Sequence, residues 1–362
     1  MSAHHPVILD IGTAISKVGF ANMGEPAKTA PTVIGYRFYG EPDIYIGGRA
    51  IRMSSMLNMV WPVVNGSVVD WYLWERYIEY MLRYELGIRP DGSRIIMIEP
   101  FLTRMNERIK KAEVLFESLN VGELYISTQV MASLFSSRSI SGLVLHSSES
   151  ETVAVPIHNG VIIQGCVRRM SITGREITRR LLLILENWGL YIPERLKPVI
   201  VRDMKERLCY VAVDYVAELE KARFRRSTIA LHYELPDGQV LELAEERFMV
   251  PEMMFGGHGI VDVVVDSILS CDPEIRHDIV SNIVISGGNT MFMNFVKRFE
   301  MELKKKLPEE LRDRVRISSM ENRTITPYVG AHIMAPILQH RKALLTKERW
   351  REEGINAVLR ML

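Results

Sequence analysis

A strand–turn–strand pattern occurs twice in this chain, and the repetition limits the folds that the sequence can adopt. Residues 7–20 form the first copy and residues 142–157 form the second. In each copy two apolar runs, rich in β-branched residues, flank a short polar turn, which is typical of two paired β-strands. Two such hairpins indicate a duplicated unit whose turns face each other across a cleft.

Length and charge narrow the class of protein further. The chain has 362 residues, of which 47% are hydrophobic and 25% charged, and this length favours two lobes. The formal net charge of +1 gives no overall attraction to nucleic acid or to an anionic membrane. No apolar run approaches the length needed to cross a bilayer. We therefore expect no direct nucleic-acid partner and no membrane insertion.

The cysteines and the N-terminus indicate a compartment. Cys166, Cys209 and Cys271 are far apart and have no zinc or redox spacing, which favours a reducing environment. The first five residues have no signal-peptide character. The expected location is the cytoplasm.

The first polar turn combines residue types that suit a phosphate site. Gly12 can adopt a positive φ, and Thr13 with nearby backbone amides could hold a phosphate. Asp10 at a strand end could orient a metal-bound water, and Lys17 could reach the phosphate chain. The same residues also fit a simple hairpin with an exposed acid and lysine.

The second polar turn is poorly suited to phosphate. Residues 146–152 contain no glycine, and Glu149 and Glu151 would repel an anion unless a cation intervened. The duplication therefore extends to the pattern of strands but not to the chemistry of the turns.

A glycine pair follows a third apolar run. Residues 283–285 read as a buried strand, and apolar residues recur at helical spacing over residues 291–303. Gly287 and Gly288 between them would let the backbone pass close to a ligand. Packing alone is an alternative reason for glycine there.

Residues 201–210 read as a helix. Val201, Met204 and Leu208 fall on one face, which predicts that Lys205 and Glu206 lie on the opposite, outward face. Such a pair can bind an adenine edge and ribose hydroxyls, although any solvated helix face has the same pattern.

Together these segments resemble the actin family, within the wider superfamily that includes sugar kinases and heat-shock chaperones. The resemblance covers almost the whole chain, and the matching strings occur in the order found in actins. They are Leu9–Phe20, Asp203–Ala212, Tyr233–Val240, Glu246–Phe248, Pro251–Glu252, Ile285–Met291 and Tyr328–Ala331.

The resemblance implies an α/β, actin-like (ribonuclease-H-like) fold with two related lobes around a nucleotide cleft. The first lobe would comprise residues 1–136 plus 326–362, with one subdomain at about 33–61. The second lobe would comprise residues 137–325, with one subdomain at about 173–255. Each lobe would hold a mostly mixed sheet flanked by helices.

The resemblance also implies a cofactor, ATP or ADP with Mg²⁺, and residues that hold it. Asp10 would act on the metal through water, and Gln129 would position the attacking water. The phosphates would meet Gly12, Thr13, Ala14 and Lys17, and the adenosine would meet Lys205, Glu206, Gly287 and Gly288.

Several departures from actins weaken this chemistry. His146 replaces the aspartate that opens the second phosphate loop, Ser148 and Ser150 replace its glycines, and Glu149 matches the aspartate between them. Val153 matches a histidine that helps to polarise the hydrolytic water. Because hydrolysis depends on positioned water and metal, we expect very slow or no ATP turnover and a nucleotide that is weakly held or absent.

Two loops that make filament contacts in actin are shortened. One lies between Gly35 and Ile46, and the other is reduced to Gly256-Gly257-His258. The apolar groove that receives a neighbour's loop is retained in its residue types. The groove positions are Phe135, Gly160, Val161, Met334 and Ile337.

A subunit with the groove but without the loop would terminate an actin-like filament at its pointed end, as an actin-related subunit does in dynactin. The expected function is a structural subunit of a cytoskeletal assembly, with actin or actin-related subunits as partners. The alternatives are a chromatin-remodelling subunit, with a nuclear location, and a polymerising actin-like ATPase. A metabolite kinase of the superfamily would need a carboxylate base beside a sugar pocket.

Two other stretches have ordinary interpretations. Residues 221–226 are basic but lie near Glu218 and Glu220, which is typical of a solvated helix face. Ile355, Val358, Leu359 and Leu362 fall on one helical face, which would pack on its own lobe or dock a partner.

Overall fold

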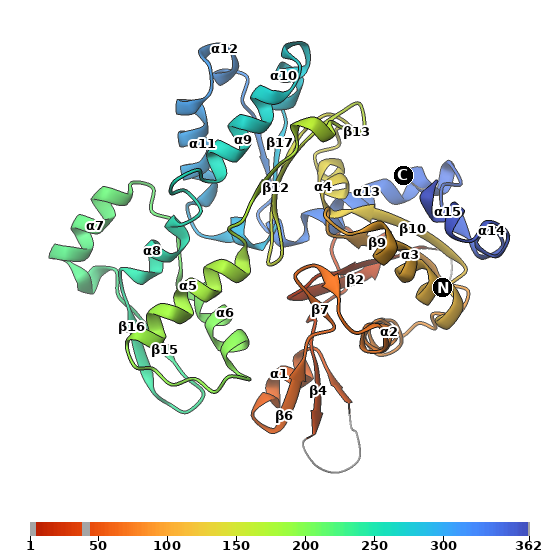
Figure 1. Ribbon diagram of the computed structural model, residues 1–362, viewed down its shortest axis with the longest axis horizontal. Helices are drawn as coiled ribbons and strands as arrows, with labels where there is room; N and C mark the ends of the chain where they lie inside the picture. Colours follow the sequence, from red (N-terminus) through yellow and green to blue (C-terminus); the bar gives the residue numbers. More distant parts are fainter. Residues whose placement is uncertain (1–4, 38–43, 361–362) are drawn as a thin grey trace. The chain divides into compact units, whose positions relative to one another are not determined.

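The chain divides into two compact units. The computed structural model describes residues 5–37 and 44–360. Unit 1 comprises Met1–Ile140 and Thr324–Leu362, and unit 2 comprises Ser141–Arg323. The boundaries expected from the sequence were 136/137 and 325/326, and the limits of the smaller subdomains remain predictions. In Figure 1 the blue C-terminal helices of unit 1 lie beside its yellow and orange elements.

Unit 1 contains a central mixed sheet and several short elements. Its strands are β1 (Val7–Ile11), β2 (Ile15–Phe20), β3 (Lys28–Pro31), β4 (Ile34–Arg37), β5 (Ile44–Ile46), β6 (Leu57–Val60), β7 (Val63–Val64), β8 (Ser67–Val68), β9 (Arg94–Glu99), β10 (Glu123–Thr128) and β19 (Leu345–Thr346). Its α-helices are α1 (Gly48–Arg52), α2 (Trp71–Tyr80), α3 (Met105–Glu113), α4 (Gln129–Ser136), α13 (Thr326–His340), α14 (Lys347–Glu353) and α15 (Ile355–Leu359).

The six-stranded sheet of unit 1 has the order β19-β10-β9-β1-β2-β3. β1 pairs antiparallel with β2 and parallel with β9, and β9 pairs parallel with β10. The period-two pattern of residues 95–98 sends alternate side chains to opposite faces. Ile95 and Met97 join the apolar cluster that includes α2, whereas Ile96 and Ile98 join the cluster that includes α4 and α13. Both faces of the sheet are therefore buried.

Unit 2 repeats this arrangement. Its strands are β11 (Gly142–Ser147), β12 (Thr152–His158), β13 (Val161–Ile162), β14 (Arg168–Met170), β15 (Leu231–Glu234), β16 (Val240–Leu243), β17 (Ile283–Ser286) and β18 (Ile317–Ser319). Its α-helices are α5 (Gly174–Asn187), α6 (Lys197–Leu208), α7 (Tyr215–Phe224), α8 (Glu246–Glu252), α9 (Ile260–Ser270), α10 (Pro273–Val280), α11 (Phe295–Lys306) and α12 (Glu309–Arg312).

The central pairings in unit 2 reproduce those of unit 1, although β19 and β13 extend the two sheets at different places. β11 pairs antiparallel with β12 and parallel with β17, which pairs parallel with β18. β11 and β17 therefore correspond to β1 and β9, as the repeated hairpin predicted. The turns of the two hairpins thus occupy the same topological position, each within its own unit.

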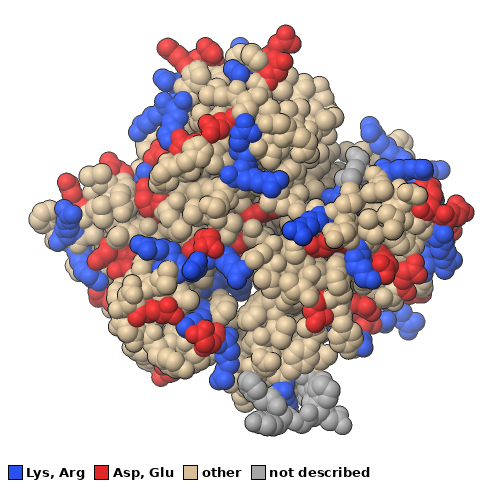
Figure 2. Space-filling view, in the orientation of Figure 1, with Lys and Arg blue, Asp and Glu red and all other residues tan. Residues whose placement is uncertain are grey.

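The surface segments behave mostly as expected. Residues 221 and 223–226 are exposed, and basic and acidic side chains are intermingled on the face shown in Figure 2. In the C-terminal helix α15 Val358 is buried, but Ile355 and Leu359 are exposed, so the predicted apolar face packs only in part. Leu362 lies outside the described residues. Among the helices of residues 5–37 and 44–360, none has the length and apolar character needed to cross a membrane.

Candidate nucleotide site

The hairpin of unit 1 brings three predicted site residues together. Asp10 and Lys17 are opposite each other in the β1–β2 register, and Lys17 Nζ lies 3.0 Å from Asp10 Oδ2. Thr128 caps α4 by accepting a hydrogen bond from the Met131 amide, which fixes Gln129 at the start of the helix. Gln129 Nε2 donates to Asp10 Oδ1 at 2.9 Å. An acid, a cation and an amide thus form one buried cluster.

The turn of this hairpin differs from expectation at Gly12. Gly12 is not among the described glycines with positive φ. A side chain there would instead lie 2.7 Å from the Ile15 carbonyl oxygen, so glycine is required for the close approach of the turn. Thr13 Oγ1 accepts a hydrogen bond from the Gly66 amide at 2.8 Å, and the Ala14 carbonyl accepts a hydrogen bond from the Thr32 amide at 3.0 Å. The first phosphate loop is therefore fastened to neighbouring backbone.

The segment that holds Thr13 was not predicted from the sequence. Gly66 follows Asn65 in the tight turn between β7 and β8, and both residues have positive φ. An Asn-Gly pair between apolar residues is a strong signal for such a hairpin, so this element could have been predicted. Its contact with Thr13 joins residues 53 positions apart and could not have been predicted.

The second hairpin turn folds onto the N-terminus of α5. The Gly174 amide donates to the Ser148 carbonyl at 2.9 Å, and the Arg175 amide donates to the Glu149 carbonyl at 3.2 Å. The Ser148 amide donates to the Glu151 carbonyl at 2.8 Å, which closes the turn. A helix N-terminus offers amides that suit an anion, but here the loop's own carbonyls receive them.

Position 146 is part of the buried sheet beside this turn. His146 is 2% exposed, and β11 pairs it with Val153 on one side and Ser286 on the other. Its Nδ1 lies 3.1 Å from Ser286 Oγ. An imidazole and an aliphatic side chain therefore stand at two positions where the resemblance to actins implies an aspartate and a histidine.

The prediction that Lys205 lies on the outward face of its helix is wrong. Lys205 is 3% exposed, whereas the Glu206 side chain is 51% exposed and lies 3.9 Å from Arg202. Lys205 Nζ donates to the Gly174 carbonyl at 3.1 Å and lies 3.8 Å from Glu149 Oε2. The α5 N-terminus and the second loop cover this part of α6, and helical periodicity contains no information on that packing.

The two glycines after β17 have different roles. Gly287 has φ +96°, and a side chain there would overlap the Ser147 carbonyl. Asn289 Nδ2 adds a hydrogen bond to the Ser148 carbonyl at 2.7 Å. Gly287 is therefore a packing glycine that lets the second loop approach. A side chain at Gly288 would meet no atom within 4 Å, so this position remains open to a ligand.

Burial disfavours the charged forms of both Glu149 and Lys205. Burial raises the pKa of Glu149, and nearby Lys205 opposes this shift only in part. Burial likewise lowers the pKa of Lys205, with Glu149 opposing. The pKa values of both groups are thus shifted toward the neutral forms, because the attraction between the two charges at 3.8 Å does not compensate for their lost hydration.

This shift predicts a pH dependence of stability. The pKa of Glu149 in the folded protein is raised above its ordinary 4.5. The stabilisation that protonated Glu149 gives the folded state is therefore fully present below pH 4.5, and it is lost as the pH rises through the folded pKa. Glu149→Gln removes this loss. We expect the difference in free energy of unfolding between the variant and wild type to shift in favour of the variant as the pH rises above about 4.5. Urea unfolding followed by circular dichroism would measure the difference, and a difference independent of pH would contradict the prediction.

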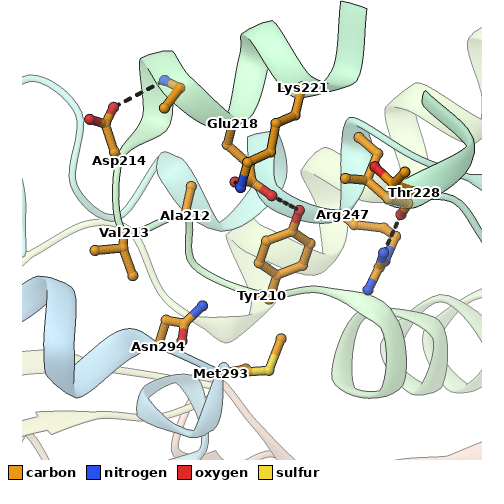
Figure 3. Close-up of a pocket in the computed structure, with 12 residues that line it drawn as sticks. Tyr210, Ala212, Val213, Asp214, Glu218, Lys221, Thr228, Arg247, Met293 and Asn294 are labelled. Carbon is orange, nitrogen blue, oxygen red and sulfur yellow. Dashed lines mark hydrogen bonds and ion pairs between the residues drawn. The ribbon is translucent and has the colours of Figure 1, made fainter. Parts of the chain in front are cut away.

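A separate pocket of about 470 Å³ lies in unit 2. Figure 3 shows Tyr210 beside Glu218 and Lys221, with Met293 and Asn294 opposite. The Tyr210 hydroxyl donates to Glu218 at 2.8 Å, and Lys221 pairs with the same carboxylate at 2.9 Å. None of the predicted nucleotide residues lines it. Met293, which lines the pocket, accepts a hydrogen bond at 3.0 Å from the amide of Val211, a residue of the actin-like string Asp203–Ala212.

Comparison with models of protein families identifies the class of protein. The model described as actin matches residues 1–362. The chain therefore belongs to the actin family, and the predicted α/β, actin-like fold is confirmed. Members of this family typically bind ATP or ADP with Mg²⁺.

The two units fit such a cofactor unequally. In unit 1, Asp10, Lys17 and Gln129 provide the carboxylate, cation and amide that suit metal-bound water and phosphate oxygens. In the described parts of the chain no group of three or more His, Cys, Asp or Glu side chains forms a direct metal cluster. In unit 2 the second loop does not fit a phosphate, because Glu149 presents a carboxylate to Lys205.

Proposed function

We propose that this actin-family chain is a structural subunit of a cytoskeletal assembly in the cytoplasm, that it terminates an actin-like filament at the pointed end, and that it turns over ATP slowly or not at all. Its partners would be actin or actin-related subunits. An actin-related subunit occupies the pointed end of the dynactin filament, and this chain would have a comparable position in its own assembly.

The observation that carries the proposal is the replacement of the plug loop by a tight turn. The Phe255 amide donates to the Glu252 carbonyl, and the Ile260 amide donates to the Met254 carbonyl at 2.7 Å. Gly257, with φ +60°, permits the reversal between them. His258 Nε2 lies 3.1 Å from Asp266 Oδ2, in the second half of α9. This segment therefore has no protruding apolar loop to offer a neighbouring subunit.

The second shortened loop supports the same view. β4 and β5 pair antiparallel, with Ile34 opposite Ile46, so the chain between them consists only of residues 38–43. These six residues lie outside the described residues. Their number is too small for the long subdomain-two loop with which actin reaches a neighbour, whatever conformation they adopt.

Apolar side chains remain at the predicted groove positions. In unit 1, Ile337 on α13 is 44% exposed, whereas Met334 is buried and Phe135 half-buried. In unit 2, Val161 is 64% exposed and follows Gly160 in the turn between β12 and β13. Exposed aliphatic residues suit an interface with a neighbouring subunit.

A bound nucleotide would serve this subunit as a structural ligand. We propose that Gly12, Thr13, Ala14 and Lys17 bind phosphates, and that Asp10 and Gln129 hold water near a Mg²⁺ ion. When bound, ATP with Mg²⁺ supplies a phosphoryl group that can be transferred to water. Of the residues predicted to contact adenosine, Glu206 and Gly288 remain candidates, whereas Lys205 is paired with Glu149 and Gly287 packs against the second loop.

A filament assay tests the proposal. Actin-like filaments with blocked barbed ends are diluted, and loss of subunits from the pointed ends is followed with and without the purified chain. We expect slower loss at substoichiometric amounts, no sedimenting polymer of the chain alone with ATP, and single-turnover hydrolysis well below that of actin. Self-assembly with brisk ATP consumption would favour the polymerising ATPase. Co-purification with remodelling subunits would favour the chromatin alternative.

A further inference from the structure

We propose that Glu149 is an internal blocking group: its carboxylate occupies Lys205, so unit 2 does not offer this lysine to an adenine nucleotide. The inference rests on the proposed function, because it names the residue that makes nucleotide binding weak. Glu149 would thus hinder nucleotide binding, whereas a residue that contacts the ligand would promote it.

The lysine has few directions in which to donate. Lys205 is 3% exposed, so its ammonium group must find acceptors within the protein. The Gly174 carbonyl at 3.1 Å is one acceptor, and Glu149 Oε2 at 3.8 Å supplies the countercharge. A ligand hydroxyl or ring nitrogen would have to displace this carboxylate in order to receive a hydrogen bond from Lys205.

The blocking carboxylate is held in place by the fold. The Glu149 carbonyl accepts a hydrogen bond from the Arg175 amide, and the preceding Ser148 carbonyl accepts from both Gly174 and Asn289. A side chain at Gly174 would lie 2.7 Å from Glu149 Oε2, so the glycine leaves just enough room for the carboxylate. The Glu149 side chain is accordingly only 24% exposed.

The same geometry makes Glu149 repel the cofactor. A nucleotide is an anion, and a fixed carboxylate beside its binding residues raises the free energy of the complex. Glu149→Gln keeps the length of the side chain and removes the charge. It releases the Lys205 ammonium group and abolishes the repulsion, and both changes favour binding.

The test uses Mg-ATP and the nucleotide-stripped, full-length chain. Isothermal titration calorimetry compares wild type with Glu149→Gln, and we expect the variant to bind about tenfold more tightly. The double variant Glu149→Gln/Lys205→Met should lose part of this gain, because the released lysine is then missing while the repulsion stays abolished. Glu176→Gln is the matched control: it removes one acid from the first turn of α5, where Glu176 lies 3.8 Å from Arg179, and should bind as wild type does. Melting curves of the apo proteins verify that each variant is folded.

The outcomes separate this inference from the proposed function. Unchanged or weaker binding by folded Glu149→Gln would show that the carboxylate contacts the ligand or is irrelevant, and would overturn the inference alone. An equal gain in the double variant would also overturn it, because Lys205 would then carry none of the effect. Brisk single-turnover hydrolysis by wild type would overturn the proposed function, whatever Glu149 does.

Discussion

Replacement of Glu99 by glutamine is expected to lower the free energy of unfolding of unit 1 by about 3 kcal/mol. Glu99 ends β9 and is 1% exposed. It pairs with Arg108 and with Lys111, whose side chains are 7% and 6% exposed. Without the carboxylate, Lys111 would keep its pairing with Glu107 at 3.1 Å but Arg108 would lose the carboxylate that it contacts, and breaking such a cluster costs more than never forming it.

Tryptophan fluorescence during urea unfolding would measure this loss, because four of the five tryptophans lie in unit 1. Glu123→Gln is the control: Glu123 lies 3.4 Å from Arg94, but both side chains are partly exposed, so we expect a change within about 0.5 kcal/mol. Adding Lys111→Met to Glu99→Gln should restore charge balance and recover part of the loss. Equal stabilities for Glu99→Gln and wild type would contradict the assigned role.

The Glu99 cluster also reaches the first phosphate loop. Glu107 accepts a hydrogen bond from the Val68 amide at 3.1 Å, and Val68 belongs to the hairpin whose Gly66 amide donates to Thr13. The buried charges therefore position the hairpin that fastens the loop. We attribute part of the expected loss in Glu99→Gln to this hairpin.

Gly287→Ala is expected to destabilise unit 2 by about 3 kcal/mol. With φ +96° and ψ 156°, position 287 has a backbone conformation that is almost restricted to glycine. The added methyl group would also overlap the Ser147 carbonyl, which belongs to the second hairpin. The loop would have to move away from β17, and its contacts with Asn289 would be strained.

Gly288→Ala provides a closely matched comparison for this prediction. The two glycines are adjacent, yet Gly288 lies in a 3₁₀ turn and a methyl group there would meet no atom within 4 Å. We expect a change within about 0.5 kcal/mol. Urea unfolding followed by far-ultraviolet circular dichroism distinguishes the two variants. Similar losses in both would mean that the glycine pair has one shared function and would refute the packing role of Gly287.

Local patterns were sufficient to predict much of the architecture. Apolar runs predicted β1, β2, β11, β12 and β17, because a buried strand needs a short run of apolar and β-branched residues in any environment. The repeated hairpin predicted a duplicated unit, and the structure adds that the first strand of each hairpin pairs in parallel with a further strand.

Asp10 and Lys17 were candidates from the first polar turn alone, whereas Gln129 became a candidate only through the resemblance to actins. Asp10 and Lys17 are close in sequence, but Gln129 is 119 residues from Asp10. No periodicity connects residues so far apart.

The sequence by itself determined that two similar hairpin units exist, that the chain is an actin-family protein, and that the second turn lacks glycine and carries acids. These properties depend on residue type and local order. Only the tertiary structure decided that Lys205 is buried, that Gly287 serves packing, and that α5 amides bind the loop's own carbonyls. Each of these properties depends on which distant segment packs against the residue. Such packing changes the residue's exposure and the free energy of its charged form, but it leaves the local sequence pattern unchanged.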